Sequence, residues 1–101
     1  MQFKKQKRLD LRESLPADIQ SAYLRNTVYV QFDQVFVNAS ERTEPTFDEL
    51  VSLCDTNCTQ VFSAVKAMSN AAHFSFYSIT DMNWFMGQLT VKVAIAASSS
   101  V

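Results

Sequence analysis

The sequence predicts an α+β domain: a three-stranded, mainly antiparallel sheet with one long helix on one face and a short N-terminal helix. Three observations support this class. Between Thr46 and Asn70 the apolar residues recur every three or four positions, as on one stripe of a helix. Residues 27–37, 73–79 and 89–96 alternate with a period of two, as strands do. The predicted order is helix, strand, helix, strand, strand.

Length and composition indicate one globular domain, because 48% of the 101 residues are apolar and 19% are charged. We expect a basic, flexible arm over residues 1–12, the domain over residues 13–97 and a frayed tail over residues 98–101. No apolar run approaches the roughly 20 residues of a membrane helix, and no apolar segment follows the basic N-terminus. The expectation is a protein without membrane span or signal peptide, located in the cytoplasm, elsewhere inside a cell or in a virion.

The first two elements follow from residues 13–37. Ser14 can cap a short helix, Pro16 suits its first turn, and the helix should end near Asn26. Residues 27–37 then form a long strand rich in β-branched and aromatic residues. Because Gln34 interrupts its apolar face, the strand is expected to bulge or to reach the edge of the core there.

The main helix is predicted to begin at a capping box, in which Thr46 and Glu49 satisfy each other's backbone donors. Residues 55–59 are poor helix formers, so a kink or break is expected there. The apolar stripe nevertheless stays in phase through Met68, which leaves one helix or two as alternatives.

The last two strands are separated by residues 80–87, which form either a hairpin tip or a single helical turn closed by Gly87. The strand that starts at Leu89 has the cleanest alternation, and we place it in the centre of the sheet. A parallel pairing of the first strand with the second is the alternative strand order.

The second face of the sheet is the first candidate site, because the main helix can cover only one face and the other is too apolar for water. Either the short helix folds over this face, or a second subunit or partner protein does. Its residues are Tyr29, Val35, Val37, Tyr77, Ile79, Ala94 and Ala96.

The connection between the last two strands is the second candidate. Aromatic and methionine side chains on a loop are typical interface anchors, and the alternative is a plug over the open end of the core. These residues are Met82, Trp84, Phe85 and Met86.

Charge is uneven along the chain. Residues 1–25 hold six bases against three acids, whereas residues 26–101 hold three bases against seven acids. The basic residues of the arm could neutralise phosphates, bind the acidic body of a neighbouring copy, or stay solvated. The acidic body argues against a nucleic-acid face that extends onto the fold. The candidate anion or nucleic-acid contacts are Lys4, Lys5, Lys7, Arg8 and Arg12.

No pattern predicts catalysis, a cofactor or a metal site. Cys54 and Cys58 fall on the apolar stripe and are expected to be free, buried thiols, while His73 is the single histidine. A thiol or metal site built from these three residues is a minor alternative. The chain's one glycine excludes a glycine-rich phosphate loop.

The sequence therefore favours a small non-enzymatic protein–protein interaction or assembly module, for example a homo-oligomer. It would act through the apolar sheet face and the aromatic connection. Viruses and mobile elements encode structural proteins and inhibitors of this kind. The alternative is a nucleic-acid-binding protein that uses its basic arm.

Overall fold

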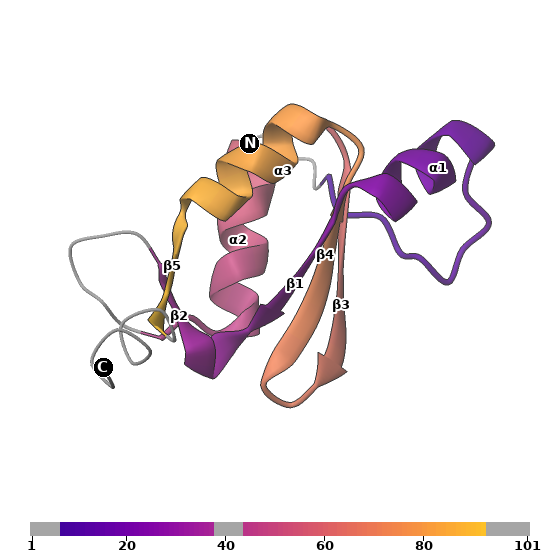
Figure 1. Cartoon of the computed structure of the whole chain (residues 1–101). Helices are drawn as coiled ribbons and strands as arrows, with labels where there is room; N and C mark the ends of the chain where they lie inside the picture. Colours follow the sequence, from indigo (N-terminus) through magenta and orange to yellow (C-terminus); the bar gives the residue numbers. More distant parts are fainter. Residues whose placement is uncertain (1–6, 38–43, 93–101) are drawn as a thin grey trace, which may run out of the picture.

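The computed structural model describes residues 7–37 and 44–92 and has an α+β fold with mainly antiparallel sheets, as predicted (Figure 1). Three α-helices, one 3₁₀ helix and five strands make up the described part of the chain. In chain order the elements are α1 (Ala17–Arg25), β1 (Thr27–Gln31), η1 (Phe32–Gln34), β2 (Val35–Val37), α2 (Phe47–Asn57), β3 (Phe62–Met68), β4 (Ala71–Phe76), α3 (Ile79–Gly87) and β5 (Leu89–Val91).

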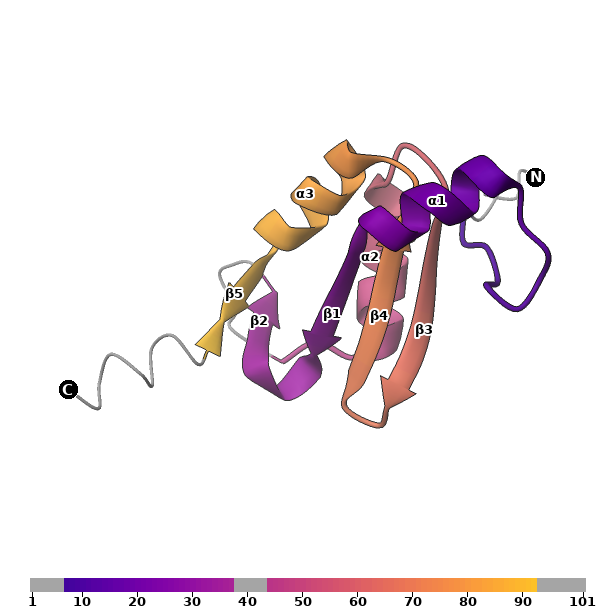
Figure 2. The ribbon, with the colours of Figure 1, turned by 45° about the vertical axis from the view of Figure 1, so that its right-hand side comes forward.

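The main sheet has the order β1–β4–β3, with both pairings antiparallel. A tight turn at residues 69–70 joins β3 to β4. In Figure 2, α2 lies behind this sheet, while α1 crosses the upper ends of its strands in front. The sheet therefore has an inner face, which carries the core, and an outer face that α1 covers only at one end.

The long helix predicted over residues 46–70 is wrong in its second half. The capping box is confirmed, since Thr46 and Glu49 exchange hydrogen bonds of 2.8 and 3.1 Å. The helix ends at Asn57, however, and Cys58 is already extended. The break lies within the run of poor helix formers, and beyond it the apolar residues of the stripe become strand β3.

The position of the last strand is also corrected. Within the described residues strand β5 pairs only with β2, in a separate two-stranded sheet, and β4 occupies the centre of the main sheet. The predicted strand over residues 27–37 is divided by η1 at Gln34, so that β1 joins one sheet and β2 the other. Residues 80–87 belong to α3, a nine-residue helix capped by the Ser78 hydroxyl, rather than to a tip or a single turn.

At the N-terminal end, α1 ends as predicted, but its first residue follows Pro16 and no side chain caps it. Its C-terminus is fixed to the sheet because Asn26 accepts a hydrogen bond from Phe76 N (2.9 Å) and donates one to Tyr77 O (3.3 Å). This anchoring determines where α1 crosses the outer face.

The core lies between the inner face of the sheet and helices α2 and α3. It is centred on aromatic side chains: the Phe85 ring of α3 lies 4.8 Å from the Phe74 ring and 5.3 Å from the Phe76 ring, between centroids. The largest fully buried side chains are Phe62, Phe74, Phe76, Phe85, Leu50, Val30, Cys54 and Cys58.

Candidate protein-interaction site

The aromatic connection contributes little exposed surface. Phe85 is fully buried, and Met82 and Trp84 are partly buried against the core. Met86 alone among the four predicted anchors exposes a large part of its side chain, at 43%. Burial arises because these residues form a helix, which turns one side toward the sheet. The placement agrees with the alternative in which they close the core.

The outer face of the sheet presents a row of exposed side chains that crosses all three strands, here called the apolar row because Tyr29 and Val65 lie on either side of His73. The strand register places Tyr29 of β1 opposite His73 of β4, and His73 opposite Val65 of β3. Tyr29 is 45% exposed and Val65 41% exposed, and the Tyr29 and His73 rings lie 4.9 Å apart. The adjoining row consists of Gln31, Ala71 and Met68.

Other residues predicted for this face lie elsewhere. Val35 is buried in the core, and Val37 is partly buried against it. Tyr77 and Ile79 are exposed, but they follow the end of β4 and do not belong to the row. Ala94 and Ala96 lie outside the described residues.

Helix α1 covers one end of the outer face, where Ala22 and Tyr23 are buried. Burial raises the pKa of Tyr23 to about 12, because the charged phenolate loses its hydration. Beside α1 a groove of about 490 Å³ remains open, with Leu24, Val65 and His73 among its lining residues. The first alternative therefore applies to one end of the face, which α1 covers, whereas the apolar row stays accessible.

The described part of the basic segment lies against β3. Leu9 N donates to Phe62 O at 2.7 Å, and Phe62 N donates to Lys7 O at 3.2 Å. The ammonium group of Lys7 donates to the carbonyl of Cys58. Lys4 and Lys5 lie outside the described residues, and the predicted flexibility of the arm stays a prediction there.

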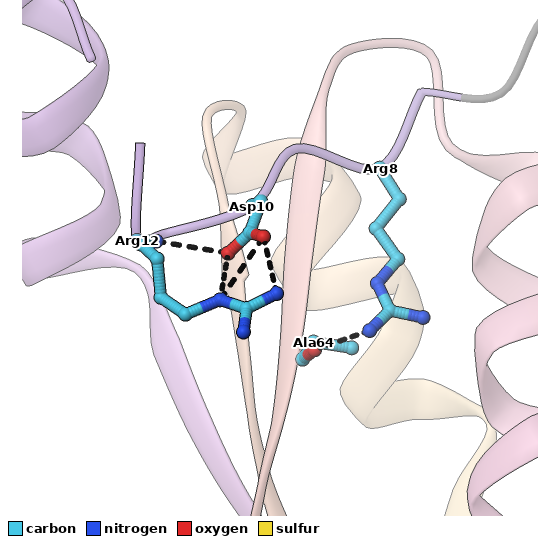
Figure 3. A network of polar contacts seen from close by, with 4 residues as sticks. All are labelled: Arg8, Asp10, Arg12 and Ala64. Atoms are coloured by element: carbon cyan, nitrogen blue, oxygen red, sulfur yellow. Dashed lines mark hydrogen bonds and ion pairs between the residues drawn. The ribbon is translucent and has the colours of Figure 1, made fainter. Parts of the chain in front are cut away.

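Two arginines of this segment have different partners, which Figure 3 shows. Arg8 Nη2 donates to Ala64 O at 3.0 Å, whereas Arg12 forms an ion pair with Asp10 at 2.7 Å. Hydrogen bonds from Arg12 lower the pKa of Asp10 to about 2. Arg12 is thereby neutralised locally, whereas Arg8 forms no ion pair with any of the described acidic residues.

The thiols and the histidine do not come together. Cys54 and Cys58 are buried in the core, whereas His73 is exposed on the outer face, so the sheet separates them. A hydrogen bond with Cys58, together with burial, raises the pKa of Cys54, which keeps it a thiol at neutral pH. Over residues 7–37 and 44–92, no three histidine, cysteine or acidic side chains cluster as metal ligands would.

Sequence reasoning missed Val65, Met68 and Lys66 as surface candidates. They belong to the stretch predicted as helix, and their exposure on or beside the sheet depends on a strand that the pattern did not predict. The available signal was the run of poor helix formers before them, which marks the point where the helix ends.

No protein-family model, curated protein sequence or solved structure matches this chain. No helix in the described part of the chain combines the length and the apolar character that crossing a membrane requires.

Proposed function

We propose that the protein is a small non-enzymatic assembly module that associates with a second copy of itself through the outer face of its main sheet. The observation that carries the proposal is the row of exposed side chains from Tyr29 to Val65, continued by Met68, to which all three strands contribute. Apolar side chains gathered on one accessible sheet face are typical of an interaction surface.

The charge of this face favours a second copy as its partner. A two-fold interface brings the same surface of both copies together, so the surface must be complementary to itself. The two rows consist of uncharged residues and one histidine, so two such faces meet without fixed like-charge repulsion. Leu11 and Leu24, exposed near the groove beside α1, can extend the buried area.

The aromatic connection contributes less to this proposal than the sheet face, since Met86 alone among its four candidate residues remains well exposed.

The nucleic-acid alternative also has less support. The Lys7 ammonium contacts a backbone carbonyl and Arg12 is paired with Asp10, so fewer cations remain for phosphates.

Light scattering over protein concentrations from about ten micromolar to about one millimolar tests the proposal. This range covers the dissociation constants expected of weak to moderate interfaces. We expect the mass to rise above the 11.4 kDa of one chain. The double variant Val65→Thr, Met68→Gln should restore the monomer, because polar side chains replace two contacts while β3 remains intact.

The matched control is the double variant Ile79→Gln, Val91→Thr. These residues are 58% and 52% exposed, respectively, but lie away from the apolar row. This variant should associate as the wild type does. A wild-type chain that remains monomeric throughout, or equal association by the Val65/Met68 variant, would contradict the proposal.

A further inference from the structure

The free edge of β3 is a second surface, which adjoins the outer face at Val65. At Phe62 this edge already accepts a parallel chain, the segment of residues 7–9. Backbone N–H and C=O groups alternate in direction along an antiparallel strand, so those of Ala64 and Lys66 point the same way as those of Phe62, away from β4. Beyond Phe62, no strand within the described residues pairs with this edge.

A groove of about 710 Å³ runs along this edge. Residues 8–12 form one wall, residues 63–66 of β3 form the other, and Phe47 at the start of α2 also lines it. Figure 3 shows the wall of residues 8–12 lying beside β3, with the Arg8 side chain reaching down to Ala64. An extended chain placed here would lie beside a strand edge that no strand of the described residues occupies, and at Ala64 it would share the carbonyl with the Arg8 guanidinium.

Two cations converge on the groove. The guanidinium carbon of Arg8 lies 5.4 Å from the centre of the Phe47 ring, and Lys66 Nζ lies 5.7 Å from the same point. Neither has an acidic partner in the part of the chain that the structure describes. Among the described lining residues the one acid, Asp10, is already paired with Arg12. The groove therefore has an excess of positive charge beside an aromatic ring.

We propose that this groove binds an extended, acidic peptide segment of another protein. The peptide adds a strand to β3 beyond Phe62, and one of its carboxylates pairs with Arg8 and Lys66. Backbone hydrogen bonds supply general affinity for a strand, and the two cations select acidic side chains.

A second copy of this chain fits the edge poorly. Two-fold pairing of β3 with β3 would place Arg8 and Lys66 of both copies along one short interface, where like charges repel. The charge of Lys66 and the register shift between Lys66 and Met68 also oppose edge-to-edge pairing of two β3 strands. An acidic strand meets no such repulsion. The proposal does not depend on self-association through the outer face.

Fluorescence anisotropy with a labelled peptide of alternating valine and glutamate, titrated with the full chain at about 50 mM salt, tests this. The control peptides carry glutamine or lysine in place of glutamate. We expect the acidic peptide to bind most tightly, and Lys66→Gln or Arg8→Gln to weaken it about tenfold each.

Lys92→Gln is the matched protein control, because Lys92 Nζ also lies over an aromatic ring, 5.0 Å from the centre of Phe36, but outside the groove. It should leave peptide affinity unchanged. Circular dichroism of each variant verifies that it is folded. Equal binding of the acidic and glutamine peptides, or equal loss in Lys92→Gln and Lys66→Gln, would overturn the proposal.

The mode of binding has its own test. An acidic peptide methylated on alternate backbone nitrogens cannot complete a strand pairing, and we expect it to lose binding. Retained affinity would refute strand addition. If the acidic peptide fails to bind but a labelled oligothymidylate binds and loses affinity in Arg8→Gln, the groove recognises phosphate and the peptide proposal is wrong.

Discussion

Replacing Phe85 with alanine distinguishes a core residue from an interface residue. The side chain is fully buried, and its ring contacts those of Phe74 and Phe76 at 4.8 and 5.3 Å between centroids. Phe-to-Ala changes in protein cores cost about 3–5 kcal/mol, because apolar burial is lost and a cavity remains. For a domain of this size, each kcal/mol lowers the thermal midpoint by about 4–8 °C, so we expect a drop of at least about 12 °C.

Thermal unfolding followed by circular dichroism measures this effect. Met86→Ala is the matched control, since it shortens a neighbouring side chain that is 43% exposed, and we expect a loss below about 1 kcal/mol. The reasoning is refuted if Phe85→Ala unfolds within about 3 °C of the wild type and instead reduces self-association. That result would make Phe85 an interface residue.

Three further substitutions test other parts of the fold. Asp81→Asn should cost about 2–3 kcal/mol in urea unfolding, because the buried carboxylate accepts the backbone N–H groups of Thr59 and Gln60 at 2.9–3.1 Å and an amide replaces one acceptor by a donor. Tyr23→Phe should be neutral or stabilising at pH 7, since the hydroxyl is buried without a partner among the described residues. With the Tyr23 pKa at about 12 in the folded protein and about 10 when unfolded, wild-type stability should fall between these pH values by about 1–2 kcal/mol more than that of Tyr23→Phe. Equal pH profiles for the two proteins would contradict this. Thr46→Ala should cost about 1 kcal/mol in the same urea assay, and no loss would show that the capping box does not stabilise α2.

Local signals predicted the elements that depend on local chemistry. The capping box at Thr46, the extent of α1 near Asn26 and the interruption near Gln34 each follow from side chains within a few residues of the feature. The exception, Ser14, failed as a cap because the helix begins after Pro16. Local chemistry therefore located most of the boundaries between elements.

Strand β3 could not be predicted from its apolar pattern. Its first three residues are all buried: Phe62 and Ala64 face the core, and Ser63 is covered on the outer face. The apolar and polar alternation that marks a half-exposed strand is therefore absent, and the remaining apolar positions also fit a helix.

The candidate site was predicted only in part for the same reason. Tyr29 was expected on the outer face and lies there, exposed, because β1 was recognised as a strand. Val65 and Lys66 were assigned to a helix, so neither the apolar row nor the cationic groove could be assembled. Both surfaces depend on β4 being central and β3 lying at the edge, which is a matter of non-local pairing.

The small sheet formed by β2 and β5 affects the order in which parts of the protein unfold locally. Three residue pairs, from Val35 with Val91 to Val37 with Leu89, join strands that are about 50 residues apart, so the entropy cost of closing this loop is large for so short a pairing. Isolated two-stranded sheets are marginal, and such units exchange their amide hydrogens before the rest of a protein does. The 3₁₀ helix η1 at Phe32–Gln34 therefore joins β1, whose amide hydrogens should exchange slowly, to β2, whose amide hydrogens should exchange early. Hydrogen exchange would spread from β5 into β2 and stop at that helix, leaving the three-stranded sheet protected.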